Sequence, residues 1–152
     1  MALRPLDAAL EIAITIANTS ESGGDAMPFS LGLHPYFKVS DLARTHLEGL
    51  ASRCFNHLEM AEADTSTQLK RLPEGVDFLS RPAGPVTLVD EQAGTQVQLQ
   101  HHQPMDLTVV WTDPPRAMVC LEPWTGPRQS LISGDRKLEL AAGESTTLSC
   151  RY

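Results

Sequence analysis

The chain has 152 residues and a formal net charge of −7, with 41% hydrophobic and 20% charged residues. This composition is typical of a globular protein, and the length suits one domain over residues 1–152 with a buried core. The acidic balance disfavours nucleic acid as a partner, because nucleic-acid binding needs a basic surface that displaces counterions. It also disfavours anionic membranes, and no stretch approaches the ~20 apolar residues that span a bilayer.

The three cysteines, Cys54, Cys120 and Cys150, are odd in number and widely spaced. Without a CxxC pair they argue against a disulfide framework and against a structural zinc site. Free thiols fit a reducing compartment, and the N-terminal residues contain no continuous apolar run of the signal-peptide type. We therefore expect a cytoplasmic location.

Strand patterns dominate the chain. Residues Leu10–Ala17 alternate apolar and polar side chains and are rich in β-branched residues, which predicts a strand. The apolar segment Phe29–Val39 is interrupted by Pro35, so its strand should end or bend near His34. Later segments with strand patterns are Pro85–Val89, Gln96–His101, Asp106–Trp111, Ala117–Glu122, Lys137–Leu140 and Thr146–Tyr152.

Helix patterns are weak, and short helical turns are expected only at Asp41–Arg44 and Glu59–Asp64. Short strands separated by Gly and Pro turns predict an all-β protein built as an antiparallel β-sandwich. The predicted strands could form a small sandwich or half of a larger one. An exposed apolar sheet would favour a homodimer.

The segment GLHPYF, Gly32 to Phe37, places a histidine before a proline and two aromatic residues. Proline biases the preceding residue toward extended geometry, so the backbone orients His34. Tyr36 offers flat apolar surface that can stack on a sugar ring. The alternative interpretation is a buried structural histidine at a strand end.

The segment VCLEPWTGP, Val119 to Pro127, interrupts an apolar strand with Glu122, and Pro123 is expected to end strand pairing. Partial desolvation raises a carboxylate's proton affinity and suits it to act as a general base. The alternative is a salt-bridged glutamate on an exposed edge. Trp111 lies in an alternating strand and should be largely core, whereas Trp124 should border a cleft.

Together these motifs resemble those of the aldose 1-epimerases and their galactose-mutarotase-like relatives. The resemblance rests on MPFSLGLHPYF, VVWTD, VCLEPWTGP and LELAAGESTTLSCRY, and extends from about Leu10 to Tyr152. It corresponds to the C-terminal part of the family. Longer members carry further strands before this region, with another histidine and an arginine that help hold the sugar. The resemblance implies a galactose-mutarotase-like supersandwich, incomplete at its N-terminus.

The resemblance also implies a cofactor-free reaction on a hexose or hexose 6-phosphate. A glutamate takes the proton from the C1 hydroxyl, a histidine protonates the ring oxygen, and the ring opens and closes on the other face. By resemblance Glu122 is the base and His34 the acid, with Tyr36, Trp124 and Asp77 as sugar-binding residues. Asp77, in GVDFLS, could instead cap backbone amides in a turn.

Two alternatives to an enzyme stay open: a non-catalytic carbohydrate-binding sandwich, and an inactive fragment that associates with another chain. Arg128 and Arg136 are candidates for a substrate phosphate, although surface arginines are commonly just solvated. No metal site is expected, because His101 and His102 point to opposite faces of a strand. His46 and His57 have no partner at a metal-binding spacing.

Overall fold

Two six-stranded antiparallel sheets form the framework of the computed structural model, which describes residues 1–6 and 8–152. The first sheet has the order β1 (Ala2–Leu6), β2 (Ala9–Ala17), β14 (Ser145–Arg151), β10 (Thr95–His101), β9 (Val86–Asp90) and β5 (Thr45–Glu48). The second has the order β4 (Tyr36–Lys38), β12 (Met118–Trp124), β11 (Leu107–Thr112), β8 (Val76–Ser80), β6 (Arg53–Asn56) and β7 (Ala61–Asp64).

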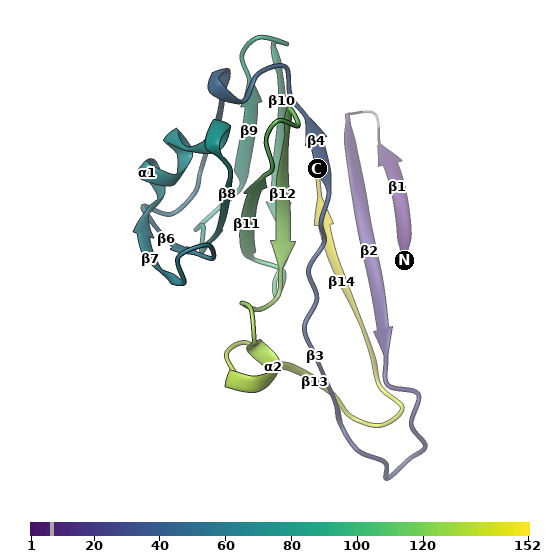
Figure 1. The fold of residues 1–152 in the computed structure, drawn as a ribbon. Coiled ribbons are helices and arrows are strands. Elements are labelled where there is room, and N and C mark those ends of the chain that lie inside the picture. The colour runs from purple at the N-terminus through teal and green to yellow at the C-terminus, as the bar shows by residue number, and fades with distance from the viewer. Residues whose placement is uncertain (7) are drawn as a thin grey trace.

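Smaller elements connect and flank these sheets. Strands β3 (Met27–Phe29) and β13 (Leu138–Leu140) pair with each other, and the helices are η1 (Leu42–Arg44), α1 (Thr65–Lys70), η2 (Leu72–Glu74) and α2 (Ser130–Ser133). Figure 1 shows β2 and β14 together at one side of the molecule and α1, β6 and β7 at the opposite side. In the described part of the chain, no helix is long and apolar enough to cross a membrane.

The core lies between the two sheets. Val86, Leu88 and Leu99 come from the first sheet, and Phe78 and Leu121 from the second; all are at most 3% exposed and belong to one cluster. Each such side chain contributes roughly 1.5–3 kcal/mol on leaving water. The antiparallel β-sandwich predicted from the sequence is confirmed.

The second sheet has another face, turned away from this core. Glu122 lies opposite Val109 in the strand register, and Val109 lies opposite Leu79. The next row along the same face runs from Asp77 through Trp111 and Cys120 to Tyr36, because side chains two residues apart share a face of a strand. These two rows hold Glu122, Asp77 and Tyr36, three of the five site residues predicted from the sequence.

The predicted strands from Leu10 onward match β2, β9, β10, β11, β12, β13 and β14 to within a few residues at each end. The strand break near His34 and the helical turn at Asp41–Arg44, observed as η1, also match. Strands β1, β5, β6, β7 and β8 were not predicted. The helical turn predicted at Glu59–Asp64 is wrong: its second half is strand β7, and helix α1 follows at Thr65.

Pro123 does not end strand pairing as expected, because β12 continues through Trp124 and Pro123 lies opposite Thr108 of β11. The Pro123 carbonyl accepts a hydrogen bond from the Leu33 N–H. The proline nitrogen points to the same side as this carbonyl, toward the irregular segment around Leu33 and away from β11. Its missing N–H therefore costs no hydrogen bond between β12 and β11.

Candidate active site

His34 and Glu122 lie beside each other, with His34 Nδ1 3.4 Å from Glu122 Oε1. Both line a pocket of about 230 Å³. The Glu122 side chain is 2% exposed and that of His34 is 51% exposed, so a ligand can reach the histidine while the carboxylate lies at the floor. The structure thus brings together two groups that are 88 residues apart in the sequence.

Backbone pairing holds the His34 segment against the end of β12. Leu33 N–H donates to the Pro123 carbonyl, Thr125 N–H donates to the Leu31 carbonyl, and Gly32 forms a bridge to Trp124. A Cβ at position 32 would lie 2.7 Å from Trp124 Nε1. Glycine is therefore required for the indole to lie this close to the backbone. This backbone contact fixes how far the GLHPYF segment lies from the VCLEPWTGP segment in space.

Burial sets the chemistry of Glu122. Desolvation raises the pKa of its carboxyl to about 7, with a further upward contribution from the charge of Asp77. Trp124 opposes the shift, because its Nε1–H donates to Glu122 Oε2 at 3.0 Å. That bond occupies one carboxylate oxygen, and the other faces His34. A carboxylate with a pKa near neutrality, beside an imidazole, is suited to general acid–base chemistry.

Aromatic side chains surround His34. Tyr36 stacks on its imidazole with ring centroids 5.0 Å apart, and Trp111 meets the same ring edge-on at 5.4 Å. The guanidinium of Arg116 lies over the Trp111 ring at 5.4 Å. The prediction that Trp111 is largely core is wrong. Trp111 is only half-buried, because its neighbour Val110 faces the core and alternation turns Trp111 to the opposite face.

Asp77 lies within strand β8, and both of its carboxylate oxygens have partners. Oδ1 is 2.6 Å from His57 Nδ1, and Oδ2 accepts from Arg128 at 2.7 Å. The alternative that Asp77 caps amides in a turn is therefore wrong, because its side-chain oxygens contact His57 and Arg128. The His57 ring also stacks near Trp124 at 6.2 Å, so it connects Asp77 with the indole that holds Glu122.

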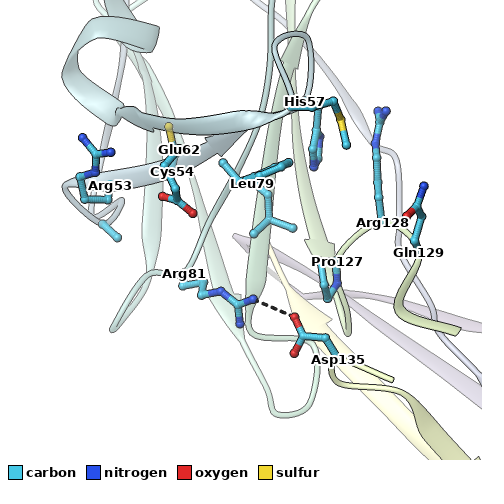
Figure 2. Close-up of a pocket in the computed structure, with 13 residues that line it drawn as sticks. Arg53, Cys54, His57, Glu62, Leu79, Arg81, Pro127, Arg128, Gln129 and Asp135 are labelled. Atoms are coloured by element: carbon cyan, nitrogen blue, oxygen red, sulfur yellow. Dashed lines mark hydrogen bonds and ion pairs between the residues drawn. The ribbon is translucent and has the colours of Figure 1, made fainter. Parts of the chain in front are cut away.

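A larger pocket of about 530 Å³ lies next to this group and shares Pro127 with the smaller one. Figure 2 shows Leu79 near the middle of this pocket, between His57 and the ion pair that Arg81 forms with Asp135. The charged groups of Arg81 and Asp135 are 3.2 Å apart. Its walls combine apolar and charged side chains. Such mixed lining is typical of sites for small polar ligands.

The sequence analysis did not predict the contact of His57 with Asp77 or that of Arg116 with Trp111. It also did not predict the ion pair of Arg128 with Asp77. No spacing pattern identifies them, because their partners come from other strands. Arg136 was a candidate for a phosphate, but its guanidinium contacts the Thr125 carbonyl, the Pro104 carbonyl and Asp106. These contacts give Arg136 a structural role between loops.

One group of side chains could hold a metal ion. His34, Cys120 and Glu122 each present a ligand atom, and these atoms lie within 4.8 Å of one another. Burial raises the pKa of the Cys120 thiol to about 12.

Comparison with known protein families gives one match: the sequence model of aldose 1-epimerases matches residues 5–152. The comparison with curated protein sequences returned no match.

Several solved structures share the fold. A protein from Synechocystis is 24% identical, with a TM-score of 0.88 over 98% of this chain and 51% of its own. A galactose mutarotase-like protein from Clostridium acetobutylicum is 17% identical, with a TM-score of 0.74 over 94% of this chain and 52% of its own. One from Lactobacillus casei is 16% identical, with a TM-score of 0.71 over 97% of this chain and 60% of its own. The chain therefore spans between half and three fifths of the length of these structures.

Proposed function

The chain belongs to the aldose 1-epimerase family, as its HPYF and EPW motifs predicted, and we propose that it interconverts the α and β anomers of a hexose. The observation that carries this proposal is the contact of His34 Nδ1 with Glu122 Oε1 at 3.4 Å in one pocket. The C1 hydroxyl and the ring oxygen of a cyclic sugar are bonded to the same carbon. A base and an acid that act on them together must therefore be neighbours, as these two side chains are.

In the proposed reaction Glu122 takes the proton of the C1 hydroxyl, and the electron pair of the broken O–H bond forms the carbonyl π bond with C1. The bond between C1 and the ring oxygen breaks, and the ring oxygen receives a proton from His34. Rotation about the C1–C2 bond turns the other face of the carbonyl to the ring oxygen. Ring closure then returns both protons and gives the opposite anomer. Each positioned proton transfer contributes ~10²–10⁴-fold to the rate.

The neighbouring residues have supporting roles in this proposal. Tyr36 fixes the plane of the His34 imidazole by stacking, and Trp124 orients Glu122 through its Nε1–H. Asp77 holds Arg128 at the wall of the larger pocket, where the sugar atoms remote from C1 would lie. We propose that this wall recognises the remote hydroxyls or a 6-phosphate.

The test is polarimetry of freshly dissolved α-galactose, α-glucose and α-glucose 6-phosphate, each with and without the protein. Glu122→Gln and His34→Asn should each lower the catalysed rate by at least ~10²-fold, because each removes one proton transfer. His46→Asn is the matched control: His46 is 42% exposed, lies 3.5 Å from Glu48 and from Glu91, and does not line the pocket. Equal rates for His34→Asn and His46→Asn would contradict the proposal.

A non-catalytic carbohydrate-binding role is the second candidate, and the exposed aromatic ring of Tyr36 beside His34 supports it. Positioning of the sugar matters strongly for rate, since a displacement of about 1 Å can cost ~10²-fold. Sugar-dependent tryptophan fluorescence without any change in mutarotation rate would support this second role and contradict the first.

A further inference from the structure

Cys120 lies next to the acid–base pair. It precedes Glu122 by two residues on β12, so both side chains lie on the same face of the strand. Cys120 lies opposite Tyr36 in the register, and Tyr36 stacks on His34. A nitrogen, a sulfur and an oxygen ligand atom consequently converge, all within 4.8 Å of one another.

We propose that His34, Cys120 and Glu122 form a binding site for Zn²⁺ and chemically similar soft divalent cations, and that the bound ion excludes sugar. Mixed imidazole, thiolate and carboxylate ligands suit borderline-soft ions and disfavour Mg²⁺ and Ca²⁺, which prefer oxygen atoms alone. Three protein ligands leave a fourth tetrahedral position for water. The half-exposed His34 side chain gives the ion access from solvent.

The geometry is close to what a zinc site requires. Zinc bonds of about 2.0–2.3 Å in a tetrahedron separate the ligand atoms by roughly 3.3–3.8 Å. His34 Nδ1 and Glu122 Oε1 already have this separation, at 3.4 Å. The remaining pairs are at most 4.8 Å apart, so closing the site needs movements of about 1 Å, within reach of side-chain rotation.

The other cysteines differ in their surroundings. Cys54 and Cys150 belong to the core cluster between the sheets, and in the described residues neither belongs to a group of three metal-ligating side chains. His46 lies 3.5 Å from Glu48 and from Glu91 and belongs to no such group in the part of the chain that the structure describes. These residues supply matched controls, a buried cysteine and a histidine with carboxylate neighbours, outside the proposed site.

Binding of the metal ion does not depend on the proposed epimerase function, but its competition with sugar does. An ion held by His34 Nδ1 and Glu122 Oε1 occupies the atoms that would exchange protons with the C1 hydroxyl and the ring oxygen. Sugar and metal should then exclude each other.

The experiment titrates the reduced full-length chain with Cd²⁺ and follows the ultraviolet charge-transfer band of a cadmium–thiolate bond, with Zn²⁺ as competitor. One Cd²⁺ per chain is expected to give the band, and Zn²⁺ should remove it. Cys120→Ala should abolish the band, and His34→Ala should weaken affinity at least ~10-fold, the least effect expected for a lost ligand. Cys150→Ala and His46→Ala should bind Cd²⁺ like the unmodified chain.

A band that persists in Cys120→Ala, or an affinity unchanged in His34→Ala, would overturn the site. If Cys120→Ala folds poorly, His34→Ala still tests the site, because replacing the half-exposed His34 should leave the fold intact. Galactose should raise the apparent Cd²⁺ dissociation constant. Site-specific Cd²⁺ binding that galactose does not affect would contradict the exclusion of sugar, while polarimetry tests the epimerase function independently.

Discussion

At the level of single residues, the burial of Glu122 couples its proton to the stability of the fold. Its folded pKa of about 7 lies above the ordinary value of 4.5, so the native state binds this proton more tightly than the unfolded chain. The resulting stabilisation is complete below pH 4.5 and is lost as the pH rises through about 7. The full difference amounts to roughly 3 kcal/mol at 1.36 kcal/mol per pKa unit.

We therefore expect the free energy of unfolding of the native chain, relative to Glu122→Gln, to decrease between pH 4.5 and about pH 7. Glutamine removes the titration while keeping the shape and an oxygen for Trp124. Urea denaturation of both proteins across this range measures the difference. A difference that does not vary with pH would show that the carboxyl is not desolvated. The mutarotation rate should rise with pH over the same range, because a general base must be ionised.

His57 should contribute measurably to stability. His57→Ala removes a side chain that is 1% exposed and deprives Asp77 of one of its two partners. Leaving a buried polar group without its partner costs about 1–3 kcal/mol. His102→Ala, which removes an exposed hydrogen bond to Ser149, should change stability by less than ~0.5 kcal/mol. Equal midpoints in urea for the two variants would contradict the role of His57.

The sequence allowed the proximity of His34 and Glu122 to be predicted, but not the contacts that support these two side chains. His34 and Glu122 stand in compact motifs that combine a proline, aromatic residues and an ionisable group. Asp77 lies in β8 and His57 lies directly after β6, 20 residues earlier, and no local sequence spacing indicates their contact. The error at Trp111 has a related cause. Five of the six β11 side chains are buried. The face that meets the other sheet carries Thr108 and Thr112 beside Val110, so the polarity of the side chains does not identify the core face.

At the level of elements, the contact between the Gly32 segment and the end of β12 determines the site geometry. Gly32→Ala should displace the Trp124 indole, because the added Cβ would lie 2.7 Å from its Nε1. The indole would then lose its hydrogen bond to Glu122. Overpacking of this kind costs about 1–3 kcal/mol, and sugar affinity should fall as well.

Tryptophan fluorescence and urea denaturation of Gly32→Ala measure these effects. Gly84→Ala is the control, since an added Cβ there has no atom within 4 Å. An emission spectrum of Gly32→Ala identical to that of Gly84→Ala would contradict the role assigned to the glycine.

Prediction of the elements succeeded where strands alternate or end in clear turns, as in Leu10–Ala17, which matches β2. It failed at β8, all of whose residues are buried, because its polar residues Asp77 and Ser80 lie on opposite faces and leave no alternation of apolar and polar side chains. It also failed at the acidic β7. That strand lies at a sheet edge, where exposed glutamate and aspartate resist pairing with another chain.

At the level of the whole molecule, strand β1 lies at the edge of the first sheet and carries the exposed Leu3. An edge strand presents unpaired backbone groups that can pair with a second copy. We expect a concentration-dependent homodimer through β1, and Leu3→Lys should shift it toward monomer. Leu131→Lys is the control, because Leu131 is 53% exposed, as Leu3 is 54% exposed, but lies on α2. Sedimentation analysis that finds the unmodified chain monomeric, or both variants equally affected, would contradict this expectation.

His34 and Glu122 differ in how firmly the second sheet holds them. Glu122 belongs to β12, which has strands on both sides, whereas His34 leads into β4, a three-residue strand at the sheet's edge. Edge segments open locally at lower free energy than central strands. Heating should therefore separate His34 from Glu122 while the rest of the sandwich is still folded. Amide hydrogen exchange should be faster at Tyr36–Lys38 than along β12, and catalysis should fail at a lower temperature than the fold. The temperature range of the proposed reaction would then be set by a strand of three residues.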